Sequence, residues 1–142
     1  MTGGLRLVLP PALVTAIREQ ARDAAPRECC GLLEGLREDG AVIVAALHPV
    51  RNLAANADRF DMDPAGQFAA QKAARANHCA IIGCYHSHPG AAARPSAADL
   101  AGADEDGFLW LIAGEDGLNA FVYSGGAFTG VPTGADWVTS SL

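Results

Sequence analysis

The sequence is poor in lysine and contains no cluster of positive charge. Lys72 is the only lysine among ten basic residues, and sixteen acidic residues bring the formal net charge to −6. A protein that binds the phosphate backbone of nucleic acid needs a basic face, so this charge argues against nucleic acid as a partner. The 142 residues, half of them hydrophobic, are typical of one globular domain rather than a disordered chain.

Long apolar segments are also lacking. The longest runs, such as residues 41–47 and 108–113, fall far short of the roughly 20 residues that span a membrane as a helix. The first 14 residues show no basic segment followed by an apolar core, so we expect no signal peptide. The sequence therefore predicts no membrane association.

Disulfide and zinc-ribbon spacings are absent. The cysteines are Cys29, Cys30, Cys79 and Cys84, and no two of them form a C-x-x-C pair. Two adjacent cysteines make a poor disulfide framework. We therefore expect reduced thiols and a cytoplasmic protein.

Strand and helix signals alternate along the chain. Strands are expected at residues 5–9, 29–36, 41–47, 79–86, 108–113, 118–123 and 126–131, with a short one at 59–62. Helices are expected to begin at Pro10-Pro11, Asp63-Pro64 and Pro95-Ser96 and to end near Pro26, Asn77 and Gly107. The turns at Asp39-Gly40 and at residues 114–117 form hairpins. These signals predict one α/β domain over residues 1–142, with a core at about 5–131, a C-terminal tail at 132–142, and a mixed sheet.

Two histidines at the end of a predicted strand are the first candidates for chemistry. In Tyr85-His86-Ser87-His88-Pro89, alternate residues point to the same side of the strand, so His86 and His88 can converge on one point. Neutral imidazole nitrogens that converge in this way are typical metal ligands. An isolated pair of this kind is nevertheless more often two ordinary surface or core histidines.

Asp99 allows two interpretations. In Ser96-Ala97-Ala98-Asp99 it has the spacing of a helix capping box, with Ser96 as the N-cap. The loop at residues 89–95 also returns the chain next to the histidines, so the carboxylate can point back at them. Two histidines and one carboxylate leave a fourth position of zinc open, which is the catalytic arrangement.

Hydrolysis at a metal also needs a base that moves protons. Glu28, which precedes Cys29-Cys30-Gly31, is a candidate. The alternative is an ordinary solvated glutamate at a strand edge, as expected for Glu34 or Glu38, and the spacing alone does not distinguish these interpretations.

Taken together, these segments resemble the motif of the JAMM (MPN+) metalloproteases. That motif combines a glutamate on an early strand with H-[ST]-H-P and, seven residues later, S-x-x-D, which is the spacing between Pro89 and Ser96 here. The segment at residues 59–64 and Ile82-Gly83 fit as well. The resemblance covers about residues 5–125, and the small size is similar to that of stand-alone prokaryotic members. It implies a mixed, mostly antiparallel curved sheet flanked by helices, with a cytidine-deaminase-like architecture.

The resemblance also implies roles for particular residues. Those that resemble the family's ligands for one catalytic Zn²⁺ are His86, His88 and Asp99. Glu28 resembles the general acid/base that activates the attacking water, and Ser96 resembles the residue that stabilises the oxyanion. The family hydrolyses isopeptide or peptide bonds that follow the C-terminal glycines of ubiquitin or ubiquitin-like proteins.

The resemblance therefore predicts a zinc-dependent isopeptidase, with a ubiquitin-like or sulfur-carrier protein ending in Gly-Gly as its substrate. Deconjugation and processing of the carrier's tail need the same site and stay open as alternatives. A glycine tail could add as a strand to an edge near residues 59–63. The resemblance also bears on chain specificity, because family members that cut ubiquitin chains grip the proximal ubiquitin with insertions in the segment that corresponds to Asp99–Trp110. This segment is short here, which argues against specificity for polyubiquitin chains.

Cys84 departs from the family pattern, in which a bulky aromatic often occupies this position. It shares a strand face with His86 and His88, so a thiolate there could act as a fourth metal ligand and hold the site shut. The simpler interpretation, which we favour, is a small buried hydrophobic residue. Cys29, Cys30 and Cys79 are expected to be packing residues, and Ser87 a structural one.

The motif residues also bear on two other functions, a non-catalytic scaffold and a zinc deaminase. A non-catalytic scaffold of the same fold would be expected to lack the five motif residues, which are all present. A zinc deaminase needs H-x-E followed by P-C-x-x-C, whereas this chain has H-x-H and no C-x-x-C. The sequence does not specify an oligomeric state.

Overall fold

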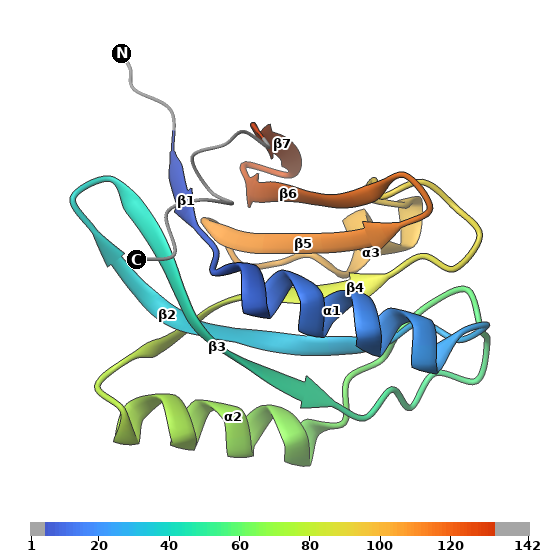
Figure 1. Cartoon of the computed structure of the whole chain (residues 1–142), viewed down its shortest axis with the longest axis horizontal. Helices are drawn as coiled ribbons and strands as arrows, with labels where there is room; N and C mark the ends of the chain where they lie inside the picture. The colour runs from blue at the N-terminus through green and yellow to red at the C-terminus, as the bar shows by residue number, and fades with distance from the viewer. Residues whose placement is uncertain (1–4, 133–142) are drawn as a thin grey trace.

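A seven-stranded sheet forms the centre of the structure, a computed structural model that describes residues 5–132 (Figure 1). The elements in chain order are β1 (Arg6–Val8), α1 (Pro11–Ala24), β2 (Cys30–Glu38), β3 (Ala41–Val50), α2 (Pro64–Ala76), β4 (Ala80–Ser87), α3 (Ala97–Gly102), β5 (Phe108–Gly114), β6 (Gly117–Ser124) and β7 (Ala127–Val131). The strand order is β1-β3-β2-β4-β5-β6-β7, in which only β1/β3 and β4/β5 are parallel pairs. The predicted mixed, mostly antiparallel sheet flanked by helices is confirmed.

Most elements lie within two residues of their predicted bounds, but β3 is longer. It continues through Pro49 to Val50, where the sequence predicted a loop from residue 48. Proline cannot donate a hydrogen bond and is tolerated only where a strand lies at an edge. β1 pairs with β3 only from Ala41 to Ile43, so β3 is an edge strand at Pro49 and the missing donor disrupts no ladder there.

The third helix is shorter than predicted. α3 ends at Gly102 rather than near Gly107, and Ala103 already has an extended backbone. Glycine is a weak helix former. The acidic run at residues 104–106 would also place negative charge at the negative end of the helix dipole.

Hydrophobic residues pack on both faces of the sheet. Ile17 of α1 packs with Leu33, Tyr85 and Leu111 on one face. On the other face, Ala70 of α2 belongs to a cluster with Cys30, Leu32, Cys84 and Trp110. The alternation along β4 therefore directs Cys84 and His86 to the α2 face and Tyr85 to the α1 face.

Gly31 provides the close approach that joins the two sequence motifs. A Cβ atom at this position would lie 2.4 Å from the ring of Tyr85, the residue before His86. The Tyr85 ring is fully buried, and its hydroxyl donates to Gln20 Oε1 at 2.6 Å. A side chain at residue 31 would therefore push β4 away from β2.

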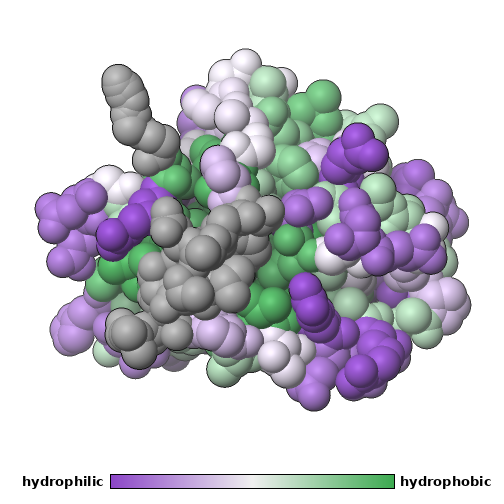
Figure 2. Space-filling view, turned by 45° about the horizontal axis from the view of Figure 1, so that its top comes forward, coloured by the Kyte–Doolittle hydropathy of each residue, from purple (hydrophilic) through white to green (hydrophobic). Residues whose placement is uncertain are grey.

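The described part of the chain has a mixed surface. On the face in Figure 2, groups of hydrophilic side chains flank smaller apolar patches. None of the helices within residues 5–132 is long and apolar enough to cross a membrane. Residues 133–142 of the predicted tail lie outside the described residues, and the domain bounds 1–142 stay a prediction.

Candidate active site

The pairing of β2 with β4 brings Glu28 to the histidine motif. In this antiparallel register Cys30 lies opposite His86. The pairing continues past the start of β2, because Ser87 N donates to Cys29 O at 3.1 Å and Cys29 N donates to Ser87 Oγ at 2.9 Å. Glu28 is therefore placed beside His88. The hydrogen bond that the Ser87 hydroxyl accepts from Cys29 N confirms the expected structural role of Ser87.

His86, His88 and Asp99 converge on one point. The Nε2 atoms of the two histidines are 3.0 Å apart. Asp99 Oδ2 lies 3.1 Å from Nε2 of His86 and 3.2 Å from Nε2 of His88. Ligand atoms at about 2.0–2.2 Å from a tetrahedral zinc ion would lie about 3.3–3.6 Å from one another. The spacing of these three atoms is close to that range.

The α3 capping box directs Asp99 towards the histidines. Asp99 N donates to Ser96 Oγ at 3.0 Å, and Ser96 N donates to Asp99 Oδ2 at 2.9 Å. Both interpretations of Asp99 from the sequence are thus compatible, because the oxygen that closes the cap also contacts both imidazoles. Ser96 itself is exposed, and its hydroxyl keeps one hydrogen to donate.

A buried polar atom without a partner lies beside the same point. Glu28, His86 and His88 each offer a ligand atom within 4.8 Å of the other two. Glu28 Oε1 is buried and has no hydrogen-bond partner among the described residues. Because buried polar groups are nearly always satisfied, this atom indicates that an ion or a polar ligand belongs here. Two imidazoles flanked by carboxylates are a donor set that suits zinc.

The second nitrogen of His88 is already occupied. Its Nδ1 lies 3.1 Å from Ala92 O, which can only accept a hydrogen bond. In the neutral ring the proton therefore sits on Nδ1 and the lone pair of Nε2 faces Asp99 and His86. Such a partner fixes the tautomer and the orientation of a metal-binding imidazole.

The four buried groups have shifted pKa values. Burial raises the pKa of Glu28 to about 7, with an opposing effect of His88 and further raising effects of Asp99 and Asp58. Burial also disfavours the Asp99 carboxylate, but hydrogen bonds from the histidines outweigh it and hold its pKa well below the usual range. Burial lowers the pKa of His86, whereas the hydrogen bond to Asp99 raises that of His88. The site thus combines one firmly charged carboxylate with one carboxyl group that populates both protonation states near neutral pH.

Two aromatic rings enclose His86. The Phe60 ring centroid lies 4.5 Å from that of His86, and Trp110 packs edge-on at 5.7 Å. These apolar walls restrict the imidazole and shield it from water on two sides. The sequence did not predict either contact, because Phe60 lies in a loop and Trp110 is on a strand from a distant part of the chain.

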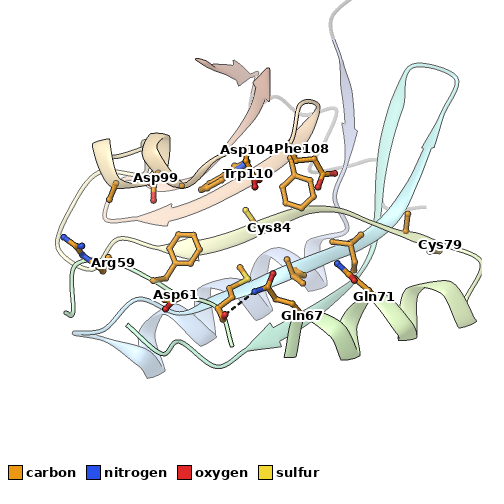
Figure 3. Close-up of a pocket in the computed structure, with 18 of the residues that line it drawn as sticks. Arg59, Asp61, Gln67, Gln71, Cys79, Cys84, Asp99, Asp104, Phe108 and Trp110 are labelled. Carbon is orange, nitrogen blue, oxygen red and sulfur yellow. Dashed lines mark hydrogen bonds between the residues drawn. The ribbon is translucent and has the colours of Figure 1, made fainter. Parts of the chain in front are cut away.

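A groove of about 760 Å³ leads to this point along the α2 face of the sheet (Figure 3). Cys84 of β4 lies in its floor, Gln67 and Gln71 of α2 line one side, and Asp99 lies at one end. Across the floor, Phe108 and Trp110 of β5 form the opposite wall. Of the three converging side chains, Asp99 lines the groove, so the groove meets the site at this carboxylate.

The predicted strand at residues 59–62 is wrong. Only Met62 forms a bridge, with Asn52, and backbone bonds from Leu53 N to Asp61 O and from Asp63 N to Arg51 O flank it. Before it, Arg59 O and Asp61 N bond to the Asn52 side chain instead of to a strand. Backbone that is satisfied by a side chain does not pair as a ladder. The backbone N–H and C=O of Phe60 have no partner among the described residues, so a short free edge lines the groove at this residue.

Cys84 is part of the groove and not of the candidate metal cluster. Its side chain is 3% exposed and belongs to the hydrophobic cluster on the α2 face. Burial raises the pKa of this thiol well above its usual value, which disfavours a thiolate. These observations favour the interpretation of a small packing residue.

Replacing Cys84 with alanine is therefore expected to leave zinc content and turnover within about twofold of wild type, because only one small buried atom is lost. Zinc stoichiometry and initial rates would test this expectation. Cys30→Ala, at a neighbouring buried thiol of the same cluster, is the matched control. A large gain in activity that is specific to Cys84→Ala would instead indicate a thiolate that blocks the site.

Comparison with known proteins identifies the family. Residues 10–124 match the family described as prokaryotic homologs of the JAB domain. The chain is 34% identical over 119 residues to the desampylase of Haloferax volcanii, covering 82% of this chain and 84% of the relative. It is 34% identical over 120 residues to a probable TtuB-protein conjugate cleaving protease of Thermus thermophilus, covering 84% and 77%.

A solved structure shows the same fold. A solution structure from Desulfitobacterium hafniense superposes with a TM-score of 0.80 at 31% identity, covering 88% of this chain and 89% of the other. The family match, the relatives and the convergent side chains agree with the resemblance seen in the sequence. The chain belongs to the prokaryotic JAB branch of the JAMM (MPN+) family and is a hydrolase of that type.

Proposed function

We propose that this hydrolase is a zinc-dependent isopeptidase that cleaves the bond after the C-terminal Gly-Gly of a ubiquitin-like or sulfur-carrier protein. The observation that carries the proposal is a groove with a free backbone edge that reaches Asp99, the carboxylate on which His86 and His88 converge. The names of the two relatives, a desampylase and a probable TtuB-protein conjugate cleaving protease, support a ubiquitin-like protein as the substrate class.

The residues that would hold zinc are His86, His88 and Asp99. Zinc bound there would supply a Lewis acid that can polarise a carbonyl and lower the pKa of water. Glu28 takes the proton of the attacking water and delivers it to the leaving amine. Its Oε1 atom has no other partner among the described residues, so it is available for this transfer. The Ser96 hydroxyl donates to the oxygen that becomes negative in the transition state.

The tail would bind as an added strand. The free N–H and C=O of Phe60 can pair with the backbone of an extended peptide. Glycines suit this position because they have no side chains to clash with the Phe60 and Trp110 rings. A Gly-Gly tail could thus reach the converging side chains while the folded carrier stays outside the groove.

A cleavage assay tests the proposal. The substrate is a ubiquitin-like protein whose C-terminal Gly-Gly is linked to a lysine of a second protein, and products are read by mass. We expect the carrier to be released with its Gly-Gly intact, activity to disappear with a zinc chelator, and zinc to restore it. A conjugate ending in Val-Val is the control, and it should resist cleavage.

Two results would count against this function. Cleavage that is indifferent to the chelator would contradict the metal mechanism, and no cleavage of any Gly-Gly conjugate by zinc-loaded protein would favour a scaffold. The masses also separate the two kinds of substrate, because deconjugation releases a whole protein and tail processing releases a short piece. The expectations of a cytoplasmic location and of no nucleic acid partner stay predictions.

A further inference from the structure

The half-buried side chain of Asn52 connects the segment that carries Glu28 with the loop that carries Phe60. Asn52 follows β3, and its Nδ2 donates to Glu28 O at 3.0 Å and to Arg59 O at 3.2 Å. Its Oδ1 accepts from Ala54 N and from Asp61 N, both at 2.9 Å. All hydrogen-bonding positions of the carboxamide are therefore used.

The orientation of this carboxamide is fixed by its partners. Both groups near Nδ2 are carbonyl oxygens, and both groups near Oδ1 are backbone amides. In a flipped amide the NH₂ group would face two backbone N–H groups and the oxygen would face two carbonyl oxygens, so all four hydrogen bonds would be lost. Aspartate, which has no N–H, would keep the bonds at Oδ1 and lose those at Nδ2. These two pairs of bonds can thus be removed separately.

The two segments joined by Asn52 carry different parts of the site. Glu28 lies in the short link between α1 and β2. Phe60 lies between Arg59 and Asp61, covers His86 and presents the free edge of the groove. The link and the loop after Asn52 are also joined by Arg27, whose Nη2 donates to Ala54 O. Rigid support of this kind is needed because small displacements of a reacting group slow a reaction strongly.

We propose that Asn52 is a positioning residue, which holds the Glu28 backbone at a fixed place relative to the groove edge at Phe60. The proposal rests on the isopeptidase function proposed above. Asn52 does not touch the reacting atoms. Its Nδ2 holds Glu28 O and also Arg59 O on one side of the edge, and its Oδ1 holds Asp61 N on the other side. Asn52 therefore fixes the position of the bound substrate tail relative to the carboxyl group that takes up the proton.

Two substitutions separate these effects in the full chain loaded with zinc. Asn52→Asp keeps the acceptor for Asp61 N but loses the donors to Glu28 O and Arg59 O, so we expect kcat to fall by about 10- to 100-fold with a smaller rise in KM than in Asn52→Ala. Asn52→Ala loses all four bonds, so we expect the same fall in kcat together with a clear rise in KM. Zinc content should match wild type in both variants.

Asn77→Ala is the matched control for general destabilisation. Asn77 also donates from its carboxamide to a buried acceptor, Glu34 Oε2 at 3.1 Å, but it lies after α2 and outside the groove lining. We expect this variant to lose stability without a change in kcat or KM of the folded protein. If Asn52→Asp behaved like Asn77→Ala, Asn52 would be merely structural and the proposal would be wrong.

Hydrogen exchange gives a readout that does not depend on activity. The Asp61 amide should exchange as slowly as wild type in metal-free Asn52→Asp, and about tenfold faster or more in Asn52→Ala, because only alanine removes its acceptor. Equal exchange in all three proteins would overturn the assigned network. If this exchange pattern holds but wild-type protein cleaves no Gly-Gly conjugate, the proposed isopeptidase function is wrong and the hydrogen-bond network is right. If wild-type protein cleaves the conjugate and kcat is unchanged in both variants, only the positioning role of Asn52 is wrong.

Discussion

Glu28→Gln is expected to retain zinc and to lower kcat by about 10²- to 10⁴-fold, the usual contribution of a general acid/base. Glutamine is close to glutamate in shape but cannot take up the proton of an attacking water. Metal content by elemental analysis and single-turnover rates on a Gly-Gly conjugate would measure the two effects independently. The separation matters because Glu28 also lies within 4.8 Å of both histidines and could compete with Asp99 as a ligand.

The geometry favours Asp99 over Glu28 as the ligand. Asp99 Oδ2 lies within 3.2 Å of both Nε2 atoms, whereas Glu28 forms no hydrogen bond to either histidine. Glu38→Gln, at an exposed position of β2, is the control and should change neither measurement. Loss of zinc from Glu28→Gln would assign the glutamate to the metal instead, and near-normal turnover would exclude it from proton transfer.

His88→Ala should lower zinc affinity by more than the roughly 10- to 100-fold that is typical when an outer-sphere partner is lost, because a direct ligand is removed. Activity should fall with zinc occupancy and recover in part at high zinc concentration. Titration with zinc against a competing chelator would measure the affinity. Circular dichroism would confirm that the fold persists, since His88 lies at the end of β4 and outside both hydrophobic clusters.

His78→Asn is the matched control for this histidine. His78 is exposed and has a left-handed backbone with φ of 58°, a conformation that asparagine tolerates. We expect its zinc affinity to equal that of wild type. Full zinc occupancy of His88→Ala at a zinc concentration just above the protein's would contradict ligation by His88.

The sequence by itself determined the local parts of the site. The two-residue period of a strand directs His86 and His88 to one side, and the capping box turns Asp99 back towards them because both effects act within a few residues. The hairpin turn at Asp39-Gly40 and the helix start at Asp63-Pro64 were predicted for the same reason, and both are confirmed.

Glu28 is a different case, because the family resemblance and not the local sequence selected it. Nothing near Glu28 distinguishes it from Glu34, which is also buried but bonds to His48 and Asn77 instead of facing the histidines. The register of β2 against β4 places Glu28 beside His88. That register depends on two segments that are far apart in the chain.

Only the tertiary structure decided how the parts are held together. Asn52 has no neighbour in sequence that suggests a role, yet its carboxamide takes Arg59 O and Asp61 N, two backbone groups that a strand at residues 59–62 would have paired. The same bonds leave Phe60 as the free edge above His86. A hydrogen-bond network between distant loops depends on where the sheet brings them, and neither periodicity nor spacing along one segment carries that information.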